Sequence, residues 1–366
     1  MGLASTRFPV EISPELLAEQ APIQDGTGGS YAARLLDVRF APSTSAERIQ
    51  QIAEETGYPI ISATFLGSAP VLPASYRVRV ADGDSIEKLQ TAAARLEAVP
   101  EVEVAELSSR GVVFHAVDLD GELGQPELQR IRVDEAHMVA TGENVSIAII
   151  DSAFVRRGGD RRRFFCDSAN IPESRCLGSI DVGTTRSGRH GAQMAALVAA
   201  ESDGTGITGV APRASVLGGS QPSEPEALAR QIVEASRRGA RVLNMSFSLI
   251  RPSSSGIDQI SSATRFVSKT VVVVASAGND RVNPTERVAP CSSSGVLCVG
   301  GTEAGGGFRA RDSNFGSAVA IAAPFAERSA GGTSASAAIV SGVAALILET
   351  HPDWTRIWSG DVCSTV

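Results

Sequence analysis

Val145-Ser-Ile-Ala-Ile-Ile-Asp151 is a nearly continuous apolar run that ends in a carboxylate. A short run of this kind is typical of a strand that is buried on both faces of a parallel sheet. Parallel sheets present functional residues at the carboxyl ends of their strands, and Asp151 stands at such an end. We therefore expect Asp151 to be a buried carboxylate that orients another group. The alternative is that it caps a turn, as many aspartates in this position do.

Further strands and helices alternate along the chain on the C-terminal side of this run. The alternation predicts an α/β fold with a mostly parallel sheet and flanking helices. Strands are expected at Val145–Ile150, Val216–Leu217, Val242–Met245, Val271–Ala275 and Val296–Val299, and helices at Ala192–Ala200, Glu226–Arg238 and Thr333–Glu349.

The N-terminal part of the sequence predicts a second, smaller domain. Its elements follow a β-α-β-β-α-β order, which is typical of a small α+β ferredoxin-like domain. They are expected at Arg34–Phe40, Ser45–Thr56, Ile60–Phe65, Tyr76–Val80, Ser85–Leu96 and Val102–Leu107. We expect this domain to span residues 30–108, after a disordered segment at 1–29, and a linker at 109–127 to connect it to a domain at 128–366.

Composition excludes several classes of partner. The 366 residues are 43% hydrophobic, which is enough to form the cores of two domains. A net charge of −8 argues against a nucleic-acid partner, because phosphate binding needs a basic surface. No stretch has the roughly 18 consecutive apolar residues of a membrane span, so no membrane partner is expected. The first residues are not those of a signal peptide.

The five cysteines suggest a disulfide-bonded protein. Cys166 with Cys176, and Cys291 with Cys298, are closely spaced in Ser-, Gly- and Asn-rich sequence that suits loop-closing disulfides. Cys363 has no neighbouring partner. This pairing favours an extracytoplasmic or secreted location, whereas the missing signal peptide favours the cytoplasm, so the location stays open. A zinc site is the alternative, but no C-x-x-C motif occurs and no histidine lies near either pair, so no metal is expected.

Three other residues have positions that suit catalysis. His190 stands in a glycine-flanked entry to a helix and is the best candidate base among the four histidines. Ser334 begins an apolar helix after two glycines, so a nucleophile there would lie next to unpaired N–H groups. Asn279 follows a buried strand, and its side-chain amide could donate a hydrogen bond to an oxyanion. Each also has a structural alternative, as a helix cap or a packing residue.

Taken together in the chain order Asp, His, Asn, Ser, the four residues resemble the site of the subtilisin-like serine proteases, the subtilases of the peptidase S8 family. The resemblance covers about residues 125–350, and the N-terminal domain is similar to the family's inhibitor-type propeptide. The matching blocks are Ser146-Ile-Ala-Ile-Ile-Asp-Ser152, Arg189-His-Gly-Ala-Gln-Met-Ala-Ala196, Gly209-Val-Ala-Pro212, Asn244-Met-Ser-Phe-Ser248 and Gly332-Thr-Ser-Ala-Ser336.

The resemblance implies a serine endopeptidase that is made as a self-processing zymogen. Ser334 would attack the peptide carbonyl to form an acyl-enzyme, and His190 would take and return the proton. Asp151 would hold the imidazolium, and Asn279 with the Ser334 amide would stabilise the oxyanion. The family pattern places substrate-binding residues at Ser246, Phe247, Ser248, Ala277 and Gly278.

The resemblance also implies the partners of the chain. A protein or peptide substrate and the chain's own propeptide, acting as an intramolecular inhibitor, are the expected partners. Self-cleavage is expected between about Leu107 and His115, in the connector between the domains. The alternative is that the N-terminal domain is a permanent accessory domain. The chemistry needs no cofactor, and structural calcium is implied by the family alone.

Several residues depart from the family pattern. The differences are Ala153 in place of the usual Gly, Ala192 in place of Thr, Ala335-Ser-Ala in a serine block without its usual Pro, and Ser248 and Phe325 in place of Gly. The last two would change the shape of the cleft. The chain also ends at Val366, earlier than family members do, which would shorten the domain. These departures favour an alternative function, a catalytically silent binding protein with a subtilase fold.

Overall fold

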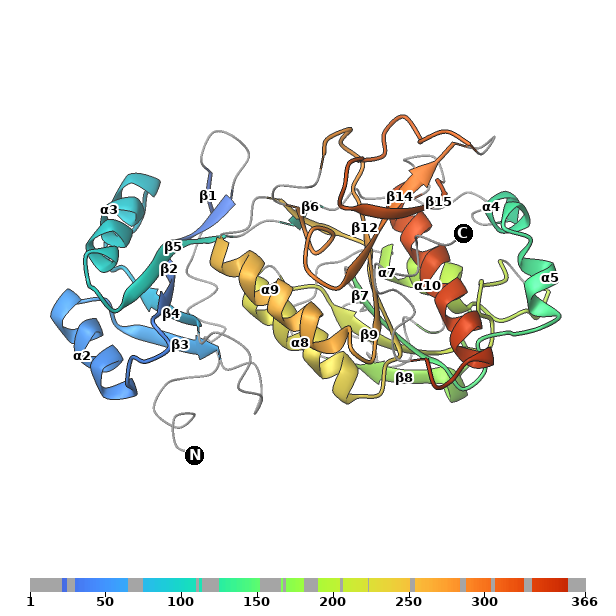
Figure 1. The fold of residues 1–366 in the computed structure, drawn as a ribbon, viewed down its shortest axis with the longest axis horizontal. Coiled ribbons are helices and arrows are strands. Elements are labelled where there is room, and N and C mark those ends of the chain that lie inside the picture. Colours follow the sequence, from blue (N-terminus) through green and yellow to red (C-terminus); the bar gives the residue numbers. More distant parts are fainter. Residues whose placement is uncertain are drawn as a thin grey trace, which may run out of the picture. The chain divides into compact units, whose positions relative to one another are not determined.

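The computed structural model describes residues 22–24, 30–64, 75–109, 112–113, 125–151, 166, 169–180, 190–204, 207–222, 224–250, 254–283, 288–303, 307–325 and 331–354. The chain forms two compact units (Figure 1). The first comprises residues 1–111 with 223–230 and 250–263, and the second comprises residues 112–222, 231–249 and 264–366. The first unit therefore contains more of the chain than the expected domain at 30–108.

An antiparallel sheet covered by two helices forms most of the first unit. Strand β2 is central, with β5 on one side, β4 and then β3 on the other, and β1 paired with the first residues of β2. Helices α2 and α3 lie on one face of this sheet (Figure 1), and their apolar side chains share a core with it. The bounds are Pro22–Gln24 (β1), Ser30–Phe40 (β2), Ala46–Thr56 (α2), Ile60–Thr64 (β3), Ser75–Arg79 (β4), Ile86–Glu97 (α3) and Val102–Ser109 (β5).

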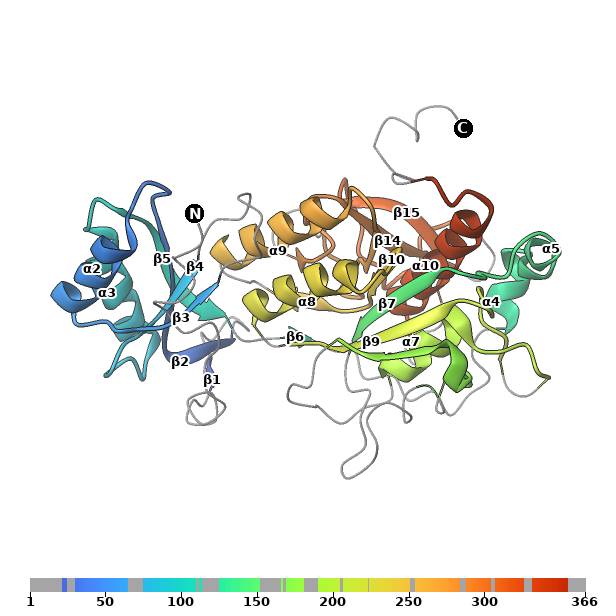
Figure 2. The same cartoon turned by 90° about the horizontal axis from the view of Figure 1, so that it is seen from below.

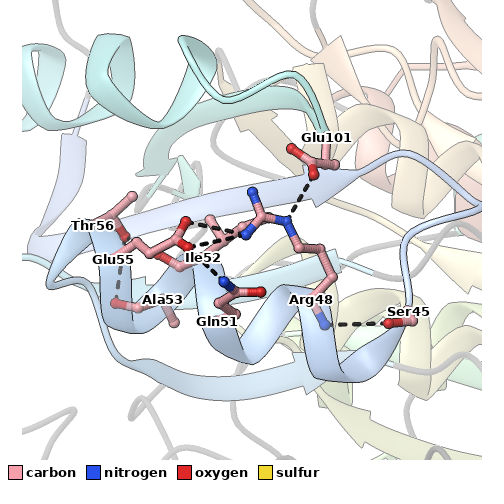
Figure 3. A network of polar contacts seen from close by, with 8 residues as sticks. All are labelled: Ser45, Arg48, Gln51, Ile52, Ala53, Glu55, Thr56 and Glu101. Carbon is pink, nitrogen blue, oxygen red and sulfur yellow. Dashed lines mark hydrogen bonds and ion pairs between the residues drawn. The ribbon is translucent and has the colours of Figure 1, made fainter.

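Helix α2 begins and ends at residues with recognisable capping chemistry. Ser45 is extended, and its hydroxyl accepts a hydrogen bond from the backbone N–H of Arg48 at 3.2 Å, a cap that stabilises a helix by about 1 kcal/mol. Gly57 ends the helix in the left-handed conformation. The Arg48 guanidinium also donates to Glu55 and Glu101, which ties the helix to the turn before β5 (Figure 3).

A buried ion cluster lies within the first unit. Nε of Arg77 on β4 donates to Oδ1 of Asp37 on β2 at 2.8 Å, and the guanidinium lies 3.9 Å from Oε2 of Glu226. Glu226 stands in the first turn of α8 (Pro225–Arg237) and also pairs with Arg230 at 3.1 Å. Burial lowers the pKa of Arg77, but the charges of Asp37 and Glu226 outweigh it, so the pKa lies above its ordinary value. Arg77 therefore stays charged in the core.

A second ion pair in the same unit joins the sheet to another helix. Arg39 of β2 pairs with Asp258 of α9 (Ser254–Val267) at 2.6 Å and with Glu103 of β5 at 3.1 Å. The first unit therefore links its sheet through charged groups to both α8 and α9.

A parallel sheet of seven strands forms the centre of the second unit. Its strand order is β15-β14-β12-β10-β7-β9-β8, and the pairs are parallel. This confirms the α/β fold that the sequence predicts. The bounds are Ser146–Asp151 (β7), Cys176–Ser179 (β8), Ser215–Ser220 (β9), Val242–Met245 (β10), Val272–Ser276 (β12), Val296–Thr302 (β14) and Val319–Pro324 (β15).

Two helices that begin at candidate site residues pack on this sheet. Helices α7 (His190–Ala199) and α10 (Thr333–Thr350) contact each other, and both contact β7. Helix α10 also packs along β12 and β14 (Figures 1 and 2). Shorter elements include α4 (Gln125–Arg130), α5 (Val133–His137), a 3-10 turn at Glu173–Arg175 and β13 (Val288–Ala289).

Helix α10 bears on the expectation that the chain has no membrane span. Among the described residues it is the one helix that is long and apolar enough to cross a membrane, with 18 residues and a mean hydropathy of 1.5. The expectation from the sequence concerns unbroken runs of apolar residues, and this helix is interrupted by Ser and Thr. Within the protein 78% of the helix is buried, and an apolar helix in a protein core can have the same length and composition as a membrane span.

Two boundaries also differ from the expected domain plan. The segment 1–29, expected to be disordered, contains β1, which pairs with β2. The expected linker 109–127 contains β6 (Val112–Val113) and the start of α4. Both strands are too short to produce a periodic signal in the sequence. Strand β1 pairs with the neighbouring β2, and β6 pairs with residues far along the chain, at 248 and 249.

Both cysteine pairs are disulfide-bonded in the structure, Cys166 with Cys176 and Cys291 with Cys298. Cys363 lies outside the described residues. Within the described residues, no group of three or more His, Cys, Asp or Glu side chains could hold a metal ion. Structural calcium stays an expectation that rests on the family alone.

Candidate active site

Asp151 and His190 form a buried hydrogen-bonded pair. Strand β7 ends at Asp151, whose side chain is fully buried, and α7 begins at His190, which is 6% exposed. Oδ1 of Asp151 lies 2.7 Å from Nδ1 of His190. A carboxylate can only accept, so Nδ1 carries the proton and Nε2 is left as the basic nitrogen of a neutral imidazole. The pair has the arrangement of a base held by an orienting carboxylate.

The charge of Asp151 also changes the basicity of His190. Burial lowers the pKa of His190, but the negative charge of Asp151 and the hydrogen bond to it outweigh this effect. The pKa of His190 therefore lies above its ordinary value. The imidazole is a stronger base than a free histidine and holds a proton more readily.

Ser334 is the second residue of α10 and is only 7% exposed. Its Oγ donates to the backbone oxygen of Ser246 at 3.0 Å, and Oγ of Ser246 lies 3.1 Å from the backbone oxygen of Ser334. Both Ser334 and His190 are described residues, and in the structure no hydrogen bond joins them. For the proton transfer that the sequence leads us to expect, the hydroxyl would first have to rotate away from Ser246.

A buried polar network holds the start of α10 against β10. The side chain of Asn244, fully buried at the centre of the sheet, accepts from Oγ of Ser246 at 2.9 Å and donates to Oγ of Ser341 at 3.0 Å. Ser341 stands two turns along α10 from Ser334. These hydrogen bonds fix the helix that carries Ser334 relative to the strand that precedes Ser246.

Asn279 has its side-chain oxygen fixed and its side-chain nitrogen available. Oδ1 accepts from both N–H and Oγ1 of Thr333, each at 2.9 Å. Among the described residues no acceptor binds Nδ2, so it can donate to a ligand. A Cβ on Gly332 would lie 2.7 Å from Asn279, and Gly332 has a φ of +54°, so only glycine fits there.

The second expected oxyanion donor is engaged. The backbone N–H of Ser334 donates to the oxygen of Gly331 at 3.0 Å. In this conformation the Ser334 N–H is therefore not available to act beside Asn279 Nδ2 as a second donor. A substrate oxyanion would have to compete with Gly331 for that N–H.

The expected substrate-binding residues form two neighbouring segments. Ser248 begins β11 (Ser248–Ile250), which pairs antiparallel with β6 so that Ser248 faces Val113 and Leu249 faces Val112. Ala277 and Gly278 follow β12. A Cβ built on Gly278 would lie 3.6 Å from Oγ of Ser248, so the two segments are close. The side chain of Phe247 is 3% exposed and contributes to the core.

The described departures from the family pattern are accommodated by their surroundings. A Cβ on Gly301 would lie 2.2 Å from the ring of Phe325, so the ring fits because residue 301 is glycine. Ala192 is buried in the first turn of α7. Ala153 lies outside the described residues.

Two residues of the site were missed from the sequence. Thr333 fixes Asn279, and Asn314 binds the segment that carries it. Thr333 could have been found, because it adjoins Ser334 in a helix start whose N–H groups need acceptors. Asn314 lies in an ordinary Asp-Ser-Asn-Phe-Gly loop, and nothing in the sequence places it near Asn279.

Comparison with protein families gives one match that covers most of the second unit. Residues 142–359 match the family described as the subtilase family. The match includes the segments that carry Asp151, His190, Asn279 and Ser334.

Curated relatives are similar at low identity. The chain is 27% identical over 246 residues to M-protease of Shouchella clausii, an alignment that covers 63% of this chain and 61% of that protein. It is also 27% identical to subtilisin Savinase of Lederbergia lenta, covering 63% of this chain and 86% of that protein. The chain thus spans less than two thirds of the length of M-protease.

Solved structures share the fold. The epidermin leader peptide processing serine protease of Staphylococcus aureus matches 88% of this chain and 91% of its own, with a TM-score of 0.60 and 19% identity. Fervidolysin of Fervidobacterium pennivorans, described as a keratinolytic enzyme related to subtilisin, matches 95% of this chain and 59% of its own, with a TM-score of 0.58 and 19% identity. At this identity the likeness concerns the fold alone.

Proposed function

Because the chain belongs to the subtilase family, we propose that it is a serine endopeptidase that hydrolyses peptide bonds through an acyl-enzyme. One observation carries the proposal: the buried hydrogen bond of 2.7 Å between Asp151 and His190. A fully buried carboxylate on an imidazole, at the carboxyl end of a parallel strand, is what a general base needs. Helix α7, which His190 begins, packs against α10, which carries Ser334.

Each member of the triad has one task. Nε2 of His190 takes the proton of Ser334 Oγ as the oxygen attacks the peptide carbonyl, and it then gives this proton to the leaving amine. Asp151 keeps the proton on Nδ1 and stabilises the imidazolium. Water then attacks the acyl-enzyme by the same route, which returns Ser334 to its starting state.

Asn279 supplies a hydrogen bond where negative charge develops. Thr333 binds its Oδ1 twice, and an exchange of Nδ2 with Oδ1 would lose the bond from the Thr333 N–H, which has only a proton to offer. An amide fixed in advance stabilises an oxyanion without reorganisation, and in a relative of this family removal of this side chain costs about 2.7–4 kcal/mol. The Ser334 N–H becomes the second donor once it leaves Gly331.

Substrate binds as an added strand. Strand β11 already pairs antiparallel with a short segment of this chain, β6, which supports the view that its edge accepts extended peptide. Backbone hydrogen bonds at Ser248 hold the peptide, and the neighbouring Ala277 and Gly278 border the other side. Neither segment carries a charged side chain, so backbone contacts give most of the affinity.

The connector between the two units is the first substrate, and the protein is a zymogen. As the connector runs from Val112 to Val113, its partner runs back from Leu249 to Ser248, so the connector heads towards Ser246. The Ser246 carbonyl binds the hydroxyl of Ser334. Within the interval expected from Leu107 to His115, this direction supports cleavage at its C-terminal end. Residues 114 and 115 themselves lie outside the described residues.

The N-terminal domain then acts as an inhibitor that remains bound. Its sheet is tied to α8 and α9 by Arg77 with Glu226 and by Arg39 with Asp258, all within the first unit. Such contacts would survive cleavage of the connector, because none of them is made by the connector.

Peptide hydrolysis tests the catalytic assignment. Ser334→Ala and His190→Ala should each lower kcat/KM by about 10⁴-fold or more, and the double variant should lose no more than either, because the residues act as one unit. Lys269→Ala, a substitution of a surface residue, is the control and should keep wild-type activity. If Ser334→Ala kept more than about a tenth of wild-type kcat/KM on this scale, the assignment would be wrong.

Intact mass tests the zymogen. The wild type should split during incubation, whereas Ser334→Ala should stay at full length. Adding a trace of active wild type to Ser334→Ala distinguishes cleavage in trans from cleavage within one chain. A wild type that stays as one full-length chain with full activity would show that residues 30–108 are a permanent accessory domain.

A second function, a catalytically silent binding protein, is favoured by one observation. Both polar groups of Ser334 that would take part in catalysis are bound elsewhere, the hydroxyl to Ser246 and the N–H to Gly331. A scaffold that never rotates this serine would bind extended peptides at β11 without cleaving them. Equilibrium binding of a peptide that stays intact, equal in wild type and Ser334→Ala, would support this function instead.

A further inference from the structure

Asn314 is a buried side chain whose hydrogen bonds all reach one segment, residues 277–282. Nδ2 donates to the oxygen of Ala277 at 2.8 Å, and Oδ1 accepts from the N–H groups of Asp280 at 2.9 Å and Val282 at 3.0 Å. The backbone N–H of Asn314 also donates to the oxygen of Gly278 at 2.9 Å. Asn314 is 2% exposed, so these are hydrogen bonds in a low-dielectric interior.

The segment clamped in this way is the one that carries Asn279. Two of the residues that Asn314 binds, Ala277 and Gly278, precede Asn279 in the chain, and the other two, Asp280 and Val282, follow it. The backbone on both sides of the oxyanion donor is therefore fixed by a single side chain and its own N–H.

Asn314 is itself anchored to the sheet. Oγ of Ser313 accepts from the N–H of Gly301 in β14 at 2.9 Å and lies 2.8 Å from the oxygen of Asn314. A Cβ on Gly278 would lie 2.5 Å from Nδ2 of Asn314, so the close approach requires glycine at 278. Ser313 and Asn314 thus connect residues 277–282 to β14 through hydrogen bonds.

We infer that Asn314 is a positioning residue for catalysis, which holds Asn279 so that its Nδ2 meets the oxyanion; this inference rests on the proposed function of Asn279. Asn314 does not touch substrate. Its effect passes through the backbone at 277–282 and then through the Asn279 side chain, whose Oδ1 is held by Thr333.

The kinetic test separates positioning from general destabilisation. Asn314→Ala should lower kcat by about 10- to 100-fold, because a misplacement of about 1 Å in a catalytic group costs about that much, while KM changes by less than about threefold. In an Asn279→Ala background the same substitution should lower kcat by less than about threefold, because the group it positions is already gone. An equal loss of kcat in both backgrounds would overturn the inference.

Asn314→Asp and Thr264→Val complete the set of variants. Asn314→Asp keeps the acceptor for Asp280 and Val282 but places a carboxylate oxygen against the oxygen of Ala277, so its kcat should fall below that of wild type. Thr264→Val removes a buried hydrogen bond in helix α9, from Oγ1 to the oxygen of Ser294 at 2.7 Å. It should lower the Tm and leave kcat unchanged.

Hydrogen exchange tests the same inference without any activity. The Thr333 N–H is bound by Asn279 Oδ1, so its protection reports the position of that side chain. Asn314→Ala should speed exchange at Asp280, Val282 and Thr333, and Thr264→Val should speed none of them. Unchanged protection at Thr333 would overturn the inference. If the wild type cleaved no peptide, the proposed function would fail, and this measurement would still decide the role of Asn314.

Discussion

The carboxylate of Asp151 meets the imidazole of His190 at 2.7 Å between Oδ1 and Nδ1, with both side chains buried at the carboxyl end of β7. This one contact raises the pKa of His190 against the opposing effect of burial. It also fixes the tautomer that leaves Nε2 basic. The electrostatic character of the site therefore depends on Asp151.

The pH dependence of kcat/KM should report this pair. The base works only when His190 is neutral, so activity should fall as the pH drops through the raised pKa, with a midpoint above the ordinary value of 6.5. The same shift stabilises the folded protein below pH 6.5, and this contribution is lost as the pH rises through the raised pKa. A rate profile in peptide hydrolysis, measured at constant ionic strength, checks the midpoint.

Asp151→Asn is the matched control for this profile. With the charge removed, burial dominates, so the pKa of His190 should fall and the acidic limb should move to lower pH. The rate at its plateau should drop by about 10⁴-fold, as it does in another triad protease. An acidic limb at the same pH in both proteins would mean that Asp151 does not act on the titrating group.

Gly278→Ala should lower activity by displacing Asn314. The new Cβ would lie 2.5 Å from Asn314 Nδ2, and the φ of +98° is unfavourable for alanine. Gly239→Ala is the matched control, since Gly239 has a φ of +85° but no atom within 4 Å of a new Cβ. Both should lose about 1–2 kcal/mol of unfolding free energy from the backbone, and only Gly278→Ala should lower kcat. Equal kcat in the two variants would contradict the role of the close approach.

Removal of the Cys291–Cys298 disulfide by alanine at both positions should lower the free energy of unfolding by about 2–3 kcal/mol, because the closed loop is short. Cys363→Ala should have no such effect. Urea unfolding without reductant measures the loss, and wild type with reductant, which opens both disulfides, should lose at least as much as the variant. Non-reducing peptide mapping that finds all five thiols free after oxidative expression would contradict both bridges.

Arg77→Met should destabilise the first unit severely. The substitution leaves Asp37 and Glu226 in the interior without the cation between them, and a broken buried pair typically costs about 3–5 kcal/mol. Arg48→Met breaks ion pairs at the surface and should cost far less. Urea unfolding followed by far-UV circular dichroism compares the two. Equal midpoints would show that the cluster is not a stabilising feature.

The fold could be predicted from the sequence where burial leaves a periodic signal. Strand β7 is an apolar run because both of its faces are covered, and α2 begins after Ser45 because that side chain caps it. Strand β15 and helix α9 could not be predicted. Strand β15 alternates between partly buried and exposed residues before two buried ones, but nearly all of its side chains are apolar, so the sequence shows little contrast. Helix α9 begins with Ser-Ser-Gly, which favours turns over helices.

The candidate residues could be predicted because they stand at the ends of strands and helices, where the sequence pattern changes. Their conformations could not. The hydrogen bond from Ser334 to Ser246 depends on a side-chain torsion and on where α10 packs, and neither leaves a trace in local sequence. Asn314 lies near Asn279 only because of the tertiary structure, so no sequence motif could have predicted its role.

Covalent labelling of Ser334 tests the central claim most directly. A serine-reactive fluorophosphonate is added to the full chain after incubation, and the modified peptide is located by mass spectrometry. An assembled triad predicts one adduct on Ser334 in the wild type, none in Ser334→Ala and a strongly slowed reaction in His190→Ala. If Ser334 stayed unlabelled in wild-type protein whose N-terminal domain had been cleaved off, or reacted as fast in His190→Ala, the protein would not be a serine protease of the proposed mechanism.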